Sequence, residues 1–252
     1  MKILILGYSS LFKKRILNVL LNNNIKFCIA SRSSPQKEKE ACSWYRSYSF
    51  ALNHSNANLV YISLPNSYHY YWAKQALEKG YHVIVDKPIC KNYLQAKNLI
   101  KIAKSKKKLI AEATFFNYHK QFEQAVKLLN GVENIKHVNT NFIIPLPKKS
   151  SILMSEKLSG GCLMDMGPYA SGVARLFCSG KLLKMYKTIK RNKQGLIVSF
   201  SILCQFEKTS YFGFFCFGGE YKNNLILFSK KQYVELNRVF SPPFNKNMKI
   251  LI

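Results

Sequence analysis

The sequence predicts two domains: an α/β domain with a parallel, doubly wound sheet, then an α+β domain with an open, mostly antiparallel sheet. Its 252 residues are enough for two ordinary domains, and a composition of 48% hydrophobic and 20% charged residues can bury a core in each. In the first half, short apolar runs alternate with helical patterns, as in βαβ units. In the second half, long β-rich stretches follow one another. We therefore place the domains at residues 1–118 and 119–252.

The elements of the first domain are recognised by their apolar runs and helical spacings. Strands are expected at 2–6, 26–30, 59–64, 82–85 and 109–112, and helices at 13–22, 68–78 and 94–104. The helical segments carry apolar residues three and four apart, and the second one stops at Gly80. The strands are continuously apolar rather than alternating, which predicts a sheet covered on both faces and therefore parallel.

The second domain is predicted to contain fewer helices. One helix is expected at 121–129, and strands are expected at 136–145, 184–190, 196–207, 211–217, 224–228 and 233–240. Turns separate these strands, as in an antiparallel sheet. Between the first two of them, the Gly-rich segment 159–172 is expected to be a loop that enters a helix.

The net charge of +27, from 39 basic and 12 acidic residues, suggests an anionic partner. Lys and Arg are scattered along the chain rather than gathered in one stripe, which favours a compositional drift over a dedicated nucleic-acid surface. Nucleic-acid binding is therefore only a minor alternative, and we expect no nucleic-acid partner.

Cysteine usage and apolar runs indicate the compartment. Seven Cys residues form no CxxC pair and no Cys/His metal pattern, so we expect reduced thiols and no metal. No run approaches the ~18 consecutive apolar residues of a membrane helix. The run from Ile3 to Leu6 is too short for the core of a signal peptide. We expect no membrane partner and a cytoplasmic location.

The turn after the first strand is the first candidate site. A dinucleotide-binding turn uses three glycines, for a tight turn, for close approach of the pyrophosphate and for helix packing. Only Gly7 is present here, and Phe12 is bulky where a small residue normally packs. Ser9 still permits an approach, so we expect Gly7, Ser9, Ser10 and Leu11 to bind the cofactor. A plain βα turn remains an open alternative.

The end of the second strand indicates which dinucleotide is preferred. A site for NAD places an acid there to accept hydrogen bonds from the ribose 2′-hydroxyl. The segment Ser31-Arg32-Ser33 has no acid. A guanidinium and hydroxyls suit a 2′-phosphate, because guanidinium offers planar bidentate hydrogen bonds. The expected cofactor is therefore NADP(H) rather than NAD(H), although an exposed polar turn remains an open alternative.

Three further stretches carry chemistry. Leu64-Pro65-Asn66 with His69, and Asp86-Lys87-Pro88, each follow a parallel strand, at the edge where open α/β sheets bind ligands. Lys87 can hold a ribose or substrate hydroxyl by charge-assisted hydrogen bonds. The third stretch contains Asp165 and Tyr169, which are one helical turn apart and can present an acceptor beside a phenol. Asp86 and Asp165 are the two aspartates of the chain.

These motifs resemble those of the glucose–fructose oxidoreductase, inositol dehydrogenase and rhizopine catabolism family (Gfo/Idh/MocA). Asp86-Lys87-Pro88 is similar to its Glu-Lys-Pro motif, and residues 76–83 match the run before that motif. Gly160-Gly161 through Asp165-Met166-Gly167, with Tyr169, is similar to its GG…DxG motif followed by His or Tyr. The resemblance implies a Rossmann NAD(P)-binding domain followed by a substrate-binding and dimerisation domain.

The resemblance also implies roles for individual residues. Lys87 would hold the nicotinamide ribose and the reacting hydroxyl, Asp165 would orient substrate, and Tyr169 would exchange a proton. A nearby Lys87 would lower the pKa of the Tyr169 phenol from about 10. Cofactor contacts are implied for Leu64, Pro65, Asn66, His69, Asp86 and Glu112.

The implied activity is hydride transfer between a nicotinamide and a hydroxyl or keto carbon of a sugar or nucleotide sugar. The alternative is a catalytically silent relative that acts as a binding or regulatory protein. Phe12 in the degenerate turn and the abrupt end of the chain motivate it, and Asn117, where relatives commonly carry Arg, is a further departure from the family. The chain also ends soon after Pro243, so we expect an incomplete second domain. A homo-oligomer through the second sheet is a further expectation.

Overall fold

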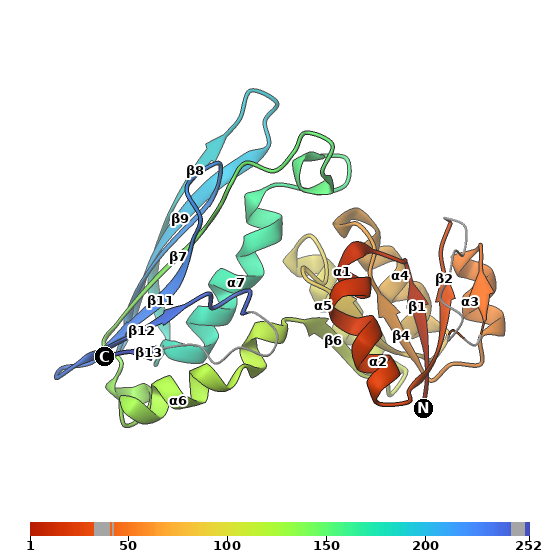
Figure 1. The fold of residues 1–252 in the computed structure, drawn as a ribbon, viewed down its shortest axis with the longest axis horizontal. Coiled ribbons are helices and arrows are strands. Elements are labelled where there is room, and N and C mark those ends of the chain that lie inside the picture. The colour runs from red at the N-terminus through yellow and green to blue at the C-terminus, as the bar shows by residue number, and fades with distance from the viewer. Residues whose placement is uncertain (33–40, 42, 243–249) are drawn as a thin grey trace. The chain divides into compact units, whose positions relative to one another are not determined.

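The computed structural model describes residues 1–32, 41, 43–242 and 250–252. The chain divides into two compact units, Met1–Ala113 and Thr114–Ile252 (Figure 1). The boundary placed at residue 118 by the sequence falls at the end of the short 3-10 helix η2 (Phe115–Tyr118), just inside the second unit. Ser33, the last residue of the predicted 2′-phosphate segment, lies outside the described residues.

The first unit contains a sheet of six strands in the order β3-β2-β1-β4-β5-β6. The strands are β1 (Lys2–Leu6), β2 (Lys26–Ala30), β3 (Trp44–Tyr45), β4 (Leu59–Ile62), β5 (His82–Asp86) and β6 (Ile110–Ala113). All neighbouring strands pair in parallel, which confirms the predicted sheet. The strand order reverses between β1 and β4, so their carboxyl ends flank the crevice where such sheets bind ligands.

Helices cover both faces of this sheet. They are α1 (Ser10–Phe12), η1 (Lys13–Leu17), α2 (Asn18–Asn22), α3 (Tyr48–His54), α4 (Asn66–Glu78) and α5 (Tyr93–Ser105). One buried cluster joins the sheet to α3, α4 and α5 through Leu52, Leu77 and Leu99. A second cluster joins the other face to the first helical segment through Phe12 and Leu20. Both faces are therefore apolar, as the continuous apolar strands predict.

Three elements of the first unit differ from the sequence-based prediction. The first helical segment begins at Ser10 rather than residue 13, because the Ser9 hydroxyl accepts a hydrogen bond from the Phe12 amide and caps it. The elements β3 and α3 were not predicted. A two-residue strand has no readable period, and α3 begins where the Ser47 hydroxyl accepts a hydrogen bond from the Phe50 amide.

The second unit is built on a seven-stranded sheet in the order β13-β12-β11-β7-β10-β9-β8. The strands are β7 (His137–Ile144), β8 (Leu182–Arg191), β9 (Ile197–Phe206), β10 (Ser210–Phe217), β11 (Lys222–Phe228), β12 (Tyr233–Asn237) and β13 (Ile250–Leu251). Only the β7–β10 pair among these is parallel, so the mostly antiparallel sheet is confirmed. The predicted strand 233–240 ends earlier because Arg238 adopts a left-handed conformation, with φ of +53°.

Helices lie on one face of this sheet. They are α6 (Lys120–Leu128) and α7 (Cys162–Phe177), with the short 3-10 helices η3 (Val132–Asn134) and η4 (Ile152–Met154) in the connections (Figure 1). The segment 159–172 enters a helix as predicted, and α7 begins at Cys162. A single buried cluster joins both helices to the sheet, for example through Phe177, Phe200 and Phe215.

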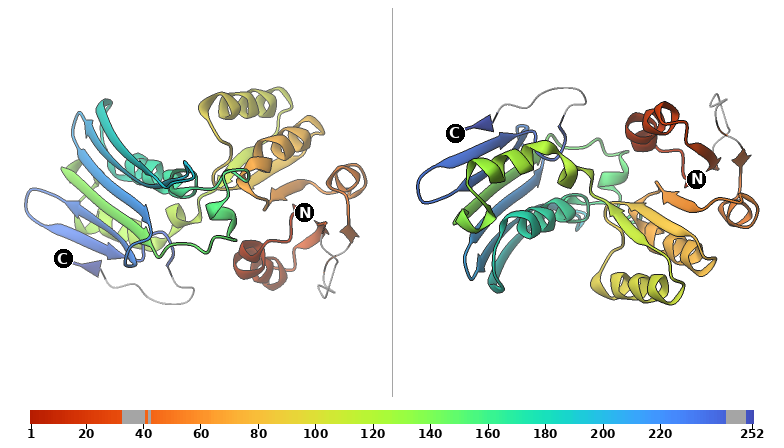
Figure 2. Two further views of the ribbon diagram at one scale, coloured as in Figure 1. Left: turned by 90° about the horizontal axis from the view of Figure 1, so that it is seen from above. Right: turned by 90° about the horizontal axis from the view of Figure 1, so that it is seen from below.

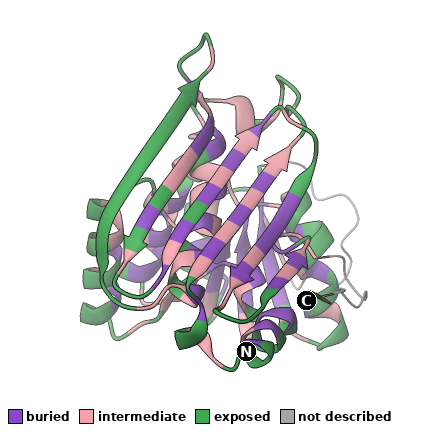
Figure 3. Ribbon diagram, turned by 90° about the vertical axis from the view of Figure 1, so that its left-hand side faces the viewer, coloured by how far each residue is buried: buried purple, intermediate pink, exposed green. Residues whose placement is uncertain are grey.

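No described helix covers the other face of the second sheet (Figure 3). The strand register places Tyr186 opposite Leu203, Leu203 opposite Phe212, and Phe212 beside Asn139. Tyr186 is 64% exposed, Leu203 49% and Phe212 37%. The edge strand β8 is exposed along its whole length and also carries Lys184, Lys187, Lys190 and Arg191. We call the row Tyr186, Leu203 and Phe212 the open apolar row.

Three negative findings concern only the described part of the chain. The six Cys residues described there are free thiols. No group of three or more His, Cys, Asp or Glu side chains there could hold a metal ion. No described helix has the length and apolar character that are needed to cross a membrane.

Candidate functional site

The predicted cofactor residues gather at the carboxyl edge of the first sheet. Because the strands are parallel, the segments after β1, β2, β4 and β5 leave the sheet on the same side. These segments hold Gly7, Ser9, Ser10 and Leu11; Ser31 and Arg32; Leu64, Pro65, Asn66 and His69; and Lys87, with Asp86 as the last residue of β5. Glu112 lies within β6.

Gly7 occupies a position that no other residue fits. Its φ is +96°, and a Cβ atom there would lie 2.2 Å from the Ser63 carbonyl oxygen and 2.8 Å from Leu64 Cδ2. The Gly7 amide donates to the Ala30 carbonyl at 2.9 Å, which ties the turn to β2. The turn after β1 therefore packs directly on the end of β4, as the tight turn of a dinucleotide site requires.

Ser9 and Phe12 replace the two missing glycines in different ways. The Ser9 hydroxyl accepts a hydrogen bond from the Phe12 amide at 3.0 Å and lies 2.7 Å from the Ser63 hydroxyl. The Phe12 ring is fully buried in the core with Ile5 and Leu20. The bulky residue thus points into the core, and the start of the helix is held by side-chain hydrogen bonds.

Asp86 anchors this arrangement from the end of β5. The Ser63 hydroxyl donates to Asp86 Oδ2 at 2.6 Å, and the Tyr61 hydroxyl donates to Asp86 Oδ1. Since Ser63 has one proton and gives it to Asp86, Ser9 must donate to Ser63. A chain of donors therefore runs from the Phe12 amide through Ser9 and Ser63 to the Asp86 carboxylate. Each bond in such a chain polarises the next.

Burial changes the pKa of two groups in this network, Asp86 and Tyr61. Burial raises the pKa of Asp86, and the hydrogen bonds from Ser63 and Tyr61 offset part of the rise. Burial and the adjacent Asp86 carboxylate raise the pKa of the Tyr61 hydroxyl well above its ordinary value. The Asp86 carboxylate therefore accepts hydrogen bonds within the protein, and its geometry suits positioning more than direct contact with a ligand.

The segment that carries Lys87 is held on both sides. The fully buried His69 ring lies between two backbone oxygens, with Nδ1 2.7 Å from the Pro88 carbonyl and Nε2 2.6 Å from the Leu64 carbonyl. The Ile89 amide donates to the Glu112 carboxylate at 2.8 Å. His69 thus braces the loops after β4 and β5, and Glu112 fixes the residues that follow Lys87.

The second unit places Asp165 and Tyr169 one turn apart in α7, both half-buried. Gly161, the N-cap residue just before the helix, has φ of +97°, and a Cβ on Gly160 would lie 2.5 Å from two carbonyl oxygens. The Tyr169 ring packs on Phe116, Phe142 and Phe240, with centroids 5.2, 5.3 and 4.9 Å away. Lys87 belongs to the first unit, so its approach to Tyr169 stays a prediction.

A hollow of about 350 Å³ lies among the loops at the carboxyl edge of the first sheet. Its described lining residues are Arg32, Arg46, Ser47, Tyr48, Ser49, Leu64, Tyr68 and Trp72. Sequence reasoning singled out Arg32 and Leu64 and missed the others. No sequence signal marks Arg46, because the strand Trp44–Tyr45 that carries it to the ligand edge is only two residues long.

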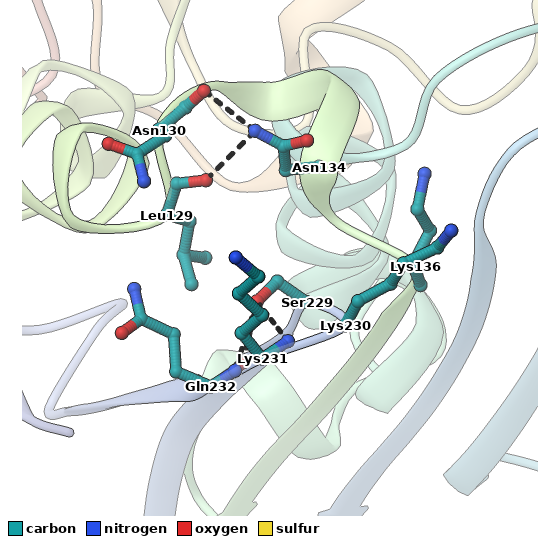
Figure 4. Close-up of a pocket in the computed structure, with 8 residues that line it drawn as sticks. All are labelled: Leu129, Asn130, Asn134, Lys136, Ser229, Lys230, Lys231 and Gln232. Carbon is teal, nitrogen blue, oxygen red and sulfur yellow. Dashed lines mark hydrogen bonds between the residues drawn. The ribbon is translucent and has the colours of Figure 1, made fainter.

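A hollow of about 400 Å³ in the second unit is lined by Leu129, Asn130, Asn134, Lys136, Ser229, Lys230, Lys231 and Gln232 (Figure 4). None of these residues was predicted to act in the site. The Asn134 amide donates to the carbonyls of Leu129 and Asn130, so it supports the end of α6. The lysines are exposed, as expected of solvated side chains in a basic protein. The candidate functional residues are therefore those at the edge of the first sheet and, in the second unit, those of α7.

Known proteins resemble this chain at both the sequence and the fold level. Residues 1–114 match the GFO_IDH_MocA family, described as an oxidoreductase family with an NAD-binding Rossmann fold. A dTDP-3,4-didehydro-2,6-dideoxy-alpha-D-glucose 3-reductase of Saccharopolyspora spinosa is 26% identical over 95% of this chain and 75% of its own length. The enzyme of the same name from Actinomadura kijaniata is 27% identical over 78% of this chain and 60% of its own length.

Two further comparisons extend this picture. D-xylose 1-dehydrogenase (NADP(+)) 2 of Haloferax volcanii is 31% identical over 53% of this chain and 42% of its own length. The fold matches that of KijD10, a 3-ketoreductase from Actinomadura kijaniata in complex with NADP and TDP-benzene. In that comparison the TM-score is 0.92 at 24% identity, and the match covers 99% of this chain and 80% of KijD10.

Gly7→Ala is expected to destabilise the first unit by about 3 kcal/mol, because the new methyl group meets the Ser63 carbonyl and the left-handed backbone is strained. Urea unfolding measures this loss. Gly195→Ala is the matched control, since Gly195 has φ of +81° but nothing within 4 Å of its added Cβ. Gly195→Ala should lower the free energy of unfolding only by the backbone strain, about 1 kcal/mol. Equal costs for the two variants would contradict the close contact.

Asp86→Asn is expected to change how stability depends on pH. Burial raises the pKa of Asp86 in the folded protein above its ordinary value of 3.8, so the folded state holds that proton more tightly than the unfolded state does. Stability therefore falls as the pH rises from near 3.8 through the folded-state pKa. The variant lacks this loss, and urea unfolding across the acidic range measures the difference.

Ser63→Ala provides the second arm of this test. The Ser63 hydroxyl lowers the pKa of Asp86, so its removal should raise that pKa further and extend the pH-dependent loss to higher pH. A difference between wild type and Asp86→Asn that stays constant with pH would show that Asp86 has the same pKa in the folded and unfolded states.

Proposed function

We propose that the chain, whose residues 1–114 match the Gfo/Idh/MocA family of oxidoreductases, transfers hydride between NADP(H) and a hydroxyl or keto carbon of a sugar or nucleotide sugar. The observation that carries the proposal is the convergence of the Gly7 turn, Arg32 and the braced Lys87 segment at the carboxyl edge of one parallel sheet. Sheets of this type bind dinucleotides at that edge.

The residues present fit an NADP(H) cofactor. The helical segment that begins at Ser10 leaves its first amides without partners in the helix, and such amides bind phosphate. The turn can close there because Gly7 has no Cβ to meet Ser63. At the end of β2, Arg32 stands where a site for NAD carries an acid. When bound, the nicotinamide accepts or supplies the hydride.

The chain's own residues would perform the remaining chemistry. Lys87 would donate hydrogen bonds to the ribose and to the reacting oxygen, in an orientation fixed by its neighbours Asp86 and Pro88. Asp165 would accept hydrogen bonds from substrate hydroxyls. In the reducing direction Tyr169 would give the reacting oxygen its proton, so that a carbonyl becomes a hydroxyl. Three Phe rings already fix the Tyr169 ring.

The relatives support the substrate class. The names of the 3-reductases describe a keto sugar carried on dTDP, and that of the Haloferax relative describes xylose. We propose a sugar or nucleotide sugar as substrate, with the second domain forming its pocket, and a cytoplasmic location. The silent alternative rested partly on Phe12. Because that ring is buried in the core, it no longer supports this reading.

Titration with NADPH, followed by intrinsic fluorescence and thermal unfolding, tests the proposal. Cofactor at one hundred times its dissociation constant should stabilise the chain by about 2.7 kcal/mol. NADPH oxidation with dTDP-linked keto sugars then reports turnover. No binding at millimolar NADPH would refute the proposal.

Lys87→Ala separates chemistry from cofactor binding. We expect turnover to fall about a hundredfold or more, because one charge-assisted contact to the reacting oxygen is lost. NADPH affinity should change only a few-fold. Lys91→Ala, which removes a nearby exposed cation beyond Ile89, is the control and should retain the wild-type rate. Undiminished turnover by Lys87→Ala would remove Lys87 from the mechanism.

We also propose that two copies associate through the open apolar row of the second sheet. Phe212→Lys should yield a monomer in sedimentation experiments in which the wild type is a dimer, because a charge would be buried without a partner. Tyr93→Lys changes a 74% exposed aromatic residue of α5 and should leave the dimer intact. A wild-type monomer at high concentration would contradict this proposal.

A further inference from the structure

We infer that Arg46 is a second phosphate-binding residue, which together with Arg32 binds the adenosine 2′-phosphate and sets the preference for NADP(H). This inference rests on the proposed function and adds to it a residue from a strand that the sequence did not reveal. The two arginines line the same hollow of about 350 Å³.

The strand register places the two arginines together. β2 and β3 pair in parallel, with Ile29 beside Trp44 and Ala30 beside Tyr45. The Ser31 amide continues the ladder by donating to the Tyr45 carbonyl at 2.9 Å. Arg46 is therefore level with Ser31, and Arg32 is the next residue of the neighbouring strand. Adjacent strands are about 4.8 Å apart, so both arginines leave the sheet at nearly the same point.

The segment after Arg46 is fixed rather than free to turn away. The Ser47 hydroxyl caps α3 by accepting from the Phe50 amide at 3.3 Å, and it lies 3.0 Å from the Ser49 hydroxyl. The Tyr45 hydroxyl donates to the His54 carbonyl at 3.3 Å, which ties the end of β3 to the end of α3. Ser47 and Ser49 also line the hollow, so hydroxyl groups accompany the guanidinium groups there.

The opposite side of the hollow is apolar. It consists of Leu64, which follows β4, and of Tyr68 and Trp72 from the first turns of α4. The Trp72 ring is itself held edge-on by Tyr48, with centroids 5.1 Å apart. A flat aromatic base suits such a wall, and a phosphate suits the arginine side. The volume lies within the range of small-molecule sites.

The charges point to a doubly negative group. No described residue that lines the hollow is acidic. Across the described ranges, no carboxylate lies within ion-pair distance of Arg32 or Arg46. Two planar guanidinium groups can each form bidentate hydrogen bonds to one phosphate. NADH has a neutral hydroxyl in place of the 2′-phosphate, so neither guanidinium charge would increase its affinity.

The test measures the affinity of the full chain for four probes: NADPH, NADH, 2′,5′-ADP and 5′-ADP. Arg46→Ala should weaken binding of NADPH and 2′,5′-ADP by about tenfold to a hundredfold. It should leave NADH and 5′-ADP within about twofold of wild type. Arg46→Lys should recover part of the loss, because it keeps the charge but not the planar pair of donors.

Lys230→Ala is the control for charge, since it removes one cation from the hollow of the second unit (Figure 4). It should leave all four affinities unchanged. If the wild type binds neither NADPH nor NADH, the proposed function itself fails. If the wild type prefers NADPH but Arg46→Ala loses nothing, or loses NADH and NADPH affinity equally, the inference about Arg46 is overturned while the proposed function stands.

Discussion

The hydrogen-bonded chain from Asp86 through Ser63 to Ser9 is the interaction on which the ligand edge of the first unit depends. It connects the ends of β5, β4 and β1, three strands that are far apart in the sequence. A buried carboxylate stabilises such a chain because it accepts two hydroxyl protons where water cannot compete. Ser9 stands where the usual turn has its second glycine, and its side-chain hydrogen bonds fix where the first helix begins.

Two side chains, His69 and Glu112, support the loops at the same edge of the sheet. His69 joins the loops after β4 and β5 through their backbone carbonyls, and Glu112 holds the Ile89 amide. Lys87 lies between these fixed points, so its ammonium group can be oriented without a large loss of conformational entropy on binding. Groups that the sequence associated with the cofactor thus divide into proposed contacts, such as Arg32, and supports, such as His69.

The sequence predicted what depends on local pattern and failed where position depends on pairing. Continuously apolar strands are a local signal, and they predicted the parallel sheet. β3 is only two residues long, so Arg46 could be placed beside Ser31 only once the register was known. Asp165 and Tyr169 were predicted from their spacing, yet the three Phe rings around Tyr169 come from distant segments. The burial of Phe12 was missed because packing against a sheet face is a tertiary property.

The arrangement of cations on the second sheet has a consequence for how copies can assemble. The edge strand β8 carries four positive side chains, whereas the face beside it carries the open apolar row. Strand pairing along an exposed edge can repeat as an open series and form fibres. Stacking of two identical faces instead gives a closed dimer, because it buries both faces. Like charges on β8 oppose the first route. The four basic residues of β8 are therefore expected to disfavour polymerisation through this edge.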